Sequence, residues 1–228
     1  MISCLLIFSL VFHTNPLKAN TEEKNIYKAL FRPGHHLTFL AGVERSRWRL
    51  KADSNSNAQS STTENISPVV LFRYAYHMHL LGRFGIFLGT TAGYIHQQTQ
   101  RDAFDPNYAV ILPSAMFGIV QNFTADERYL IGVEFAAIRY PEMRVTQKES
   151  SQRISMASTL DSLDVYGALE HFFTKDLAVS FQIGWRYVQN TCIGDCSKSM
   201  YLNNFDMTDS AFFALLGVNW QVGDLLGI

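Results

Sequence analysis

The stretch "VVLFRYAYHMHLLGRFGIFLGTTAGYIHQ", residues 69–97, is apolar enough to suggest a membrane span, yet it carries Arg73, His77, His79 and Arg83. A transmembrane helix needs about 20 consecutive apolar residues with few charges. An arginine at the bilayer centre costs roughly 3 kcal/mol on insertion scales. Two arginines and two histidines in one such window therefore argue against a helix.

The same stretch fits two β-strands joined by a tight turn at Gly82-Arg83. A strand sends alternate side chains to opposite faces. One face of the first strand is apolar: Val70, Phe72, Tyr74, Tyr76, Met78 and Leu80. After the turn a second apolar face follows: Phe84, Ile86, Leu88, Thr90, Ala92 and Tyr94. The pattern predicts a β-hairpin with one apolar and one polar face.

This alternation recurs along the chain and predicts eight strands. We place them near residues 36–52, 67–81, 83–98, 107–122, 128–146, 160–173, 176–190 and 209–222. The fourth is ambiguous, because both of its faces are apolar and Pro113 interrupts it. A proline inside a strand indicates a bulge at that point.

Long and short connections alternate between the predicted strands. The long ones include residues 53–67, 141–159 and 190–209, whereas "NFTADE" and "FTKD" are short. With eight strands, all long loops fall at one end of the sheet, and the short turns and both termini fall at the other. In lipid every backbone group must be hydrogen-bonded internally, so a membrane sheet must close on itself. Short periplasmic turns and long extracellular loops are the plan of an outer-membrane barrel.

The chain here resembles the small eight-stranded outer-membrane barrels of the OmpA/OmpX type over roughly residues 34–222. The resemblance rests on the strand pattern, the loop alternation and an export signal. It implies an all-β, eight-stranded antiparallel up-and-down transmembrane β-barrel, spanning residues 34–228, in the outer membrane of a Gram-negative bacterium. One feature departs from the family: such barrels commonly end with an aromatic residue, whereas "NWQVGDLLGI" continues past Trp220.

The N-terminus predicts export. "MISCLLIFSLVFHTNPLKAN" has an apolar core, a break at Asn15-Pro16 and a possible cleavage site after Ala19, so residues 1–19 are typical of a signal peptide. Residues 20–33 fit either a short helix at a membrane surface or a frayed tail. Cys192 and Cys196 remain in the exported chain, where an oxidising compartment favours a disulfide between them.

A soluble eight-stranded barrel of lipocalin type is the competing fold, because periodicity alone does not distinguish inside from outside. The polar face favours the membrane barrel: it carries a few charges amid Gly, Ser and Thr and has little Lys. Buried charges must be paired. We therefore expect a charge network in the lumen, acting as structural salt bridges or as a gate or proton path. Its predicted members are Glu44, Arg73, Glu134, Glu170 and Arg186.

Other polar groups predict weaker sites. Arg45, Arg47, Arg49 and Lys51 share the outward parity of the first strand, so they form either a row that binds lipid phosphates or a solvated extension. His77 and His79 share a face, but two ligands are too few for a metal site, so we predict neither metal nor cofactor.

The function that these patterns favour is structural or interactive: envelope integrity, adhesion or binding through the long loops. Outer-membrane lipid and lipopolysaccharide are the expected partners, with a further ligand at the loops. A net charge of −1 provides no basic footprint for nucleic acid. Some small barrels modify lipid A as deacylases or acyltransferases. His96, Ser114 and Asp164 are the loosely placed candidates for such a role, and without a matching signature the sequence favours a protein that is not an enzyme.

Overall fold

In a computed structural model the described residues are 33–52, 59–96, 104–106, 108–124, 126–146, 153–174, 176–189 and 205–222. They form ten antiparallel strand segments: β1 (Gly34–Ala52), β2 (Gln59–Leu81), β3 (Phe84–His96), β4 (Phe104–Pro106), β5 (Tyr108–Ile111), β6 (Ala115–Asn122), β7 (Glu127–Thr146), β8 (Arg153–Phe172), β9 (Leu177–Gln189) and β10 (Phe205–Val222). Within these ranges no helix is long and apolar enough to cross a membrane. The predicted signal peptide and the segment 20–32 lie outside them.

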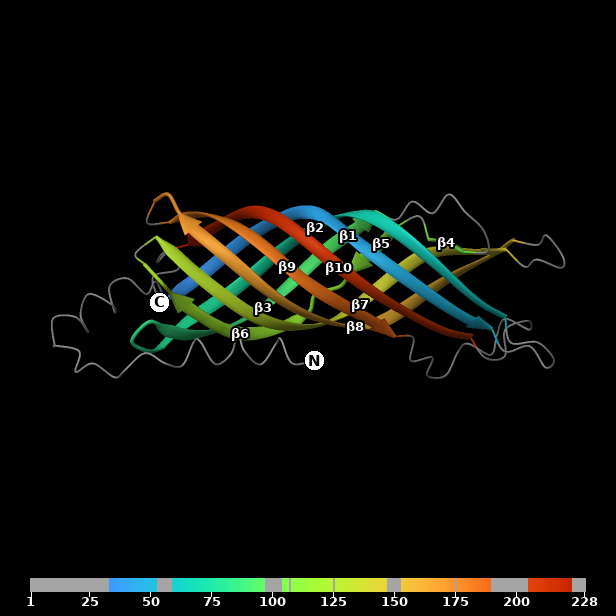
Figure 1. Ribbon diagram of the computed structural model, residues 1–228, viewed down its shortest axis with the longest axis horizontal. Helices are drawn as coiled ribbons and strands as arrows, with labels where there is room; N and C mark the ends of the chain where they lie inside the picture. Colours follow the sequence, from blue (N-terminus) through green and yellow to red (C-terminus); the bar gives the residue numbers. More distant parts are fainter. Residues whose placement is uncertain are drawn as a thin grey trace, which may run out of the picture.

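The sheet closes into a barrel, as Figure 1 shows. Each long strand pairs with the next along the chain, and β1 pairs with β10, so that His35 lies opposite Val222. The fourth position in the ring is shared by β4, β5 and β6. In the described part of the chain, the prediction of an eight-stranded antiparallel up-and-down barrel is confirmed.

The strands are staggered around the barrel. Following the paired residues once around the sheet leads from His35 to Arg45, ten residues further along β1. With about 3.3 Å per residue and ~4.8 Å between strands, this stagger tilts the strands by about 40° from the barrel axis. The oblique course of the ribbons in Figure 1 follows from this tilt.

The fourth strand is interrupted at Pro113, as the sequence predicted. Gly93 pairs with Ile111 on one side of the break, and Gly89 pairs with Met116 on the other, so β6 is shifted by one residue relative to β5. The same shift separates the pairings of β5 and β6 with β7. One extra residue reverses which parity points inward, and this reversal explains why both faces looked apolar.

Three strands extend further than the sequence predicted. β2 begins at Gln59 and not at 67, β8 begins at Arg153 and not at 160, and β10 begins at Phe205 and not at 209. The predicted loops 53–67, 141–159 and 190–209 are therefore too long. In the sequence the hydrophobic alternation stops before the backbone pairing does, so periodicity does not mark these ends.

The barrel carries charge inside and apolar surface outside. Phe39 is 44% exposed, whereas Glu44 on the other face of the same strand is 1% exposed. The outward apolar rows of three strands end in charged residues: Arg45 on β1, Arg139 on β7 and Asp161 on β8. An outward apolar belt of about 25 Å is the signature of a bilayer-spanning barrel. The alternative in which the apolar faces enclose a ligand cavity is wrong.

Candidate functional site

The interior charges form three layers, and the lowest lies near the short turns. There Arg128 on β7 donates from Nε to Glu170 on β8. The second oxygen of Glu170 accepts a hydrogen bond of 2.7 Å from Asn219 Nδ2 on β10. Arg128 Nη2 lies 3.2 Å from His36 Nδ1, and the rings of His36 and His77 lie with their centroids 4.1 Å apart and their planes tilted by 34°. This layer joins five strands, β1, β2, β7, β8 and β10, at the end of the barrel that carries the short turns.

The middle layer is built around Arg73 on β2. Its Nη1 donates to Gln182 Oε1 at 2.6 Å across the barrel, and its Nη2 lies 3.4 Å from Glu134 Oε2. The hydroxyl of Thr91 donates to the same Glu134 oxygen at 3.0 Å. The guanidinium also stands 4.4 Å above the ring of Tyr166. One arginine therefore links strands on opposite sides of the barrel.

The upper layer is built around Arg186 on β9, which is 2% exposed. Its Nη1 donates to Glu44 Oε2 at 2.8 Å, and its Nη2 donates to Asp164 Oδ2 at 2.7 Å. Asp209 on β10 is also buried at this end, and its Oδ1 has no hydrogen-bond partner among the residues that the structure describes. Three carboxylates thus surround a single described guanidinium.

The structure places all five predicted lumen residues inside the barrel and distributes them over the three layers. The prediction missed Arg128, Asp164 and Asp209. The signal for Arg128 and Asp164 was present in the parity, since Arg128 lies six residues from Glu134 and Asp164 lies six residues from Glu170. Only the strand register shows which of these groups meet.

The upper rim of β1 carries the predicted cationic row. Arg45 is exposed and its Nη2 donates to Glu64 Oε2 on β2 at 2.8 Å. This hydrogen bond lowers the pKa of the Glu64 carboxyl below its usual value. Arg47 is exposed on the same face. The backbones of Arg49 and Lys51 lie on β1, and their side chains are outside the described part.

The two histidines of "HMH" do not act together. His77 points into the barrel against His36, whereas His79 Nε2 donates to the Gly82 carbonyl oxygen at 2.9 Å in the turn. Among the described residues, no group of three or more His, Cys, Asp or Glu side chains could hold a metal ion.

The loosely placed catalytic candidates are not brought together. Asp164 is bound to Arg186 inside the barrel, and His96 stacks on Tyr94 on the outward face of β3. Ser114 accepts a hydrogen bond of 2.9 Å from the backbone N–H of Thr91 beside the interrupted strand. Cys192 and Cys196, the predicted disulfide, lie outside the described residues.

No family model and no curated protein matches this sequence. Its solved neighbours are bacterial surface barrels. Neisserial surface protein A is 14% identical, with 82% of this chain and 97% of that chain covered and a TM-score of 0.42. Ail, the attachment invasion locus protein of Yersinia pestis, is 11% identical over 82% and 99% of the two chains, with a TM-score of 0.41.

A further neighbour is the outer-membrane protease OmpT of Escherichia coli, which is 8% identical over 82% of this chain and 96% of that chain, with a TM-score of 0.47. Similarities at this level concern the fold and say nothing about the activity of this chain. The resemblance to small OmpA/OmpX-type barrels rests on the closed strand order and on the faces that its strands turn outward.

Proposed function

We propose that this chain is an outer-membrane barrel of a Gram-negative envelope with a structural or surface-interaction role. The observation that carries the proposal is the inversion of polarity, with large apolar side chains outward and ionised side chains inward. In water such a surface would aggregate, because soluble monomers rarely expose apolar patches beyond a few hundred Å². In a bilayer the same apolar surface contacts lipid hydrocarbon and is removed from water.

The interior supports a rigid scaffold more than a pore. Small barrels of eight strands have an interior that side chains can fill. Here three layers of hydrogen-bonded charges cross it, with buried apolar side chains such as Phe87, Ile111 and Leu215 between them. A wall tied together from opposite sides holds its strand ends in fixed positions.

The loops are the part of the chain that we assign to contact with partners. The connections that follow β1, β3, β7 and β9 all leave the end of the barrel away from the short turns and from Gly34 and Val222. Loops on a rigid scaffold commonly carry binding function. Arg45 and Arg47 lie below them at the edge of the apolar belt, where guanidinium groups suit the phosphates of outer-leaflet lipid.

Fractionation with a heat-modifiability gel tests the location and the closed barrel. The full chain is expressed, outer membranes are isolated, and boiled and unboiled samples are compared. A band in the outer membrane that shifts on boiling supports the proposal. A soluble periplasmic product without a shift refutes it.

Two further measurements separate the roles. A variant in which residues 190–204 are replaced by a Gly-Ser linker should keep the shift but reduce adhesion of whole cells to host-matrix proteins. The lipid A mass spectrum of cells with and without the chain should be the same. A new or missing acyl chain would instead establish a lipid A-modifying enzyme.

A further inference from the structure

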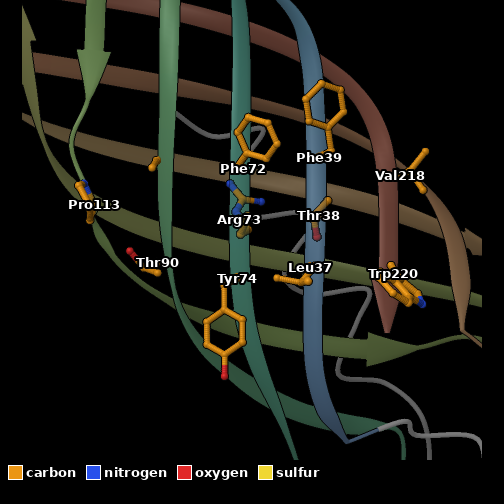
Figure 2. Close-up of a pocket in the computed structure, with 11 residues that line it drawn as sticks. Leu37, Thr38, Phe39, Phe72, Arg73, Tyr74, Thr90, Pro113, Val218 and Trp220 are labelled. Atoms are coloured by element: carbon orange, nitrogen blue, oxygen red, sulfur yellow. The ribbon is translucent and has the colours of Figure 1, made fainter. Parts of the chain in front are cut away.

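A groove of about 440 Å³ crosses the outward face of the barrel from β10 through β1 and β2 to β3 (Figure 2). Its rims are large apolar side chains that are 40–61% exposed, among them Phe39, Phe72, Tyr74 and Trp220. Thr90 and Ala92 lie on β3, and the groove ends at Pro113. It therefore lies within the apolar belt and not at the mouth of the barrel.

The groove exists because the wall is thin and irregular at β3. Thr90 and Ala92 are small, whereas their outward neighbours on β2, Tyr74 and Phe72, are aromatic. Pro113 has no N–H to donate, and beside it the backbone N–H of Thr91 donates to the Ser114 hydroxyl oxygen and not to a backbone carbonyl. The combination of small side chains and an interrupted strand leaves a depression that neighbouring side chains do not fill.

The length and course of the groove suit an extended hydrocarbon chain. It crosses four strand spacings of ~4.8 Å, or about 19 Å. A leaflet of the hydrocarbon core is about 15 Å thick, half of the ~30 Å bilayer core. Because the strands are staggered, this direction rises obliquely from Trp220, near the short turns, towards Pro113.

The lower end of the groove carries polar groups at the level where a periplasmic headgroup would lie. The Tyr74 hydroxyl is 2.6 Å from Nδ1 of the half-buried His35, and Trp220 lies opposite Leu37 near the end of β10. Rings with one polar edge are favoured at membrane interfaces. Arg45, which would suit an outer-leaflet phosphate, is at the other end of the apolar row of β1.

We propose that this groove holds one acyl chain of a glycerophospholipid from the periplasmic leaflet, with its headgroup beside His35, Tyr74 and Trp220. A peptide is a poor occupant, because its backbone polar groups would have no partners in hydrocarbon. The inference rests on the proposed membrane location. The heat-modifiability gel tests that location separately, so failure of one is distinguishable from failure of the other.

The experiment is native mass spectrometry of the full chain extracted from outer membranes, with phosphatidylethanolamine and lipid A offered as separate probes. The wild type should retain one phosphatidylethanolamine per barrel. Thr90→Trp, which fills the groove, should weaken that retention about tenfold, a change of ~1.4 kcal/mol. Ile119→Trp is the matched control, because Ile119 is 55% exposed on β6 outside the groove.

Ala92→Phe is a second groove-filling variant, and the boiling shift confirms that each variant has folded. Weaker retention in both groove variants, with Ile119→Trp unchanged, supports the proposal. Equal retention in all variants overturns the site, and retention of lipid A in place of phosphatidylethanolamine overturns the leaflet assignment. Loss of all lipid from the wild type also overturns the proposal.

Discussion

Replacement of Arg186 by Met should destabilise the barrel severely. The guanidinium is 2% exposed and supplies the described ion pairs of Glu44 and Asp164, at 2.8 and 2.7 Å. Removing it leaves both carboxylates buried without a cation, and breaking a buried pair in this way costs about 3–5 kcal/mol. With a urea slope of roughly 1–3 kcal/mol/M, the unfolding midpoint should fall by about 1–5 M.

The assay is urea unfolding in detergent micelles, in which unfolding is monitored as the loss of the fast-migrating form on unboiled gels. Arg139→Met is the matched control, since Arg139 is exposed on the outward face of β7. A triple variant that adds Glu44→Gln and Asp164→Asn should recover much of the loss, because both carboxylates that paired with Arg186 are then neutral and only Asp209 remains as a carboxylate of this layer. Equal midpoints for Arg186→Met and Arg139→Met would refute the reasoning.

Three other perturbations follow from the same geometry. Glu64→Gln should lower the urea midpoint slightly at pH 7. Arg45 lowers the pKa of Glu64, so the ion pair stabilises the barrel above the ordinary pKa of 4.5, and this contribution is lost as pH falls through the folded pKa. A difference in midpoint between variant and wild type that does not shrink as pH falls below 4.5 would contradict this. Asp209→Asn should keep or raise the urea midpoint, because it removes one of three carboxylates that surround one described guanidinium. A clearly lower urea midpoint would mean that the Asp209 carboxylate is paired. Gly217→Ala should cost about 1–3 kcal/mol, because an added Cβ would meet the backbone oxygen of Phe39; unchanged thermal stability would show that the strands can separate there.

The barrel itself could be predicted because each strand faces two different environments. Phe72 and Arg73 are adjacent in the chain, and Phe72 faces outward with 61% of its surface exposed, whereas Arg73 is 9% exposed within the lumen. This contrast produces a period of two in hydrophobicity, which is visible in a single sequence without an alignment. Loop lengths then orient the strands, and Pro113 marks the place where the strand pattern is interrupted between β5 and β6.

The partners within the lumen could not be predicted, since they depend on register. Arg186 meets Glu44 across 142 positions of sequence, and Arg73 meets Gln182 across 109. Arg128 has the inward parity of Glu134, but it follows a short turn, where a charge is expected in any protein, so its parity alone did not distinguish it from a solvated residue. The groove could not be predicted for a related reason. The sequence shows that Thr90 is small, but only the strand register shows that it lies beside the aromatic Tyr74, which leaves a depression at Thr90.

The arrangement of charge explains why the wall can be weak at one point. Each layer ties strands on opposite sides of the barrel, so closure does not depend on continuous pairing between neighbouring strands alone. The middle layer passes directly behind the interrupted strand, where Thr91 and Arg73 both bond to Glu134 on β7. Backbone bonds of 2.9 Å from Leu112 N–H to the Ala137 oxygen and from Ser114 N–H to the Thr91 oxygen persist beside Pro113, and the interior adds side-chain hydrogen bonds that tie β2 and β3 to β7 at this height. An irregularity in the backbone ladder can then leave a groove on the outward face without opening the barrel.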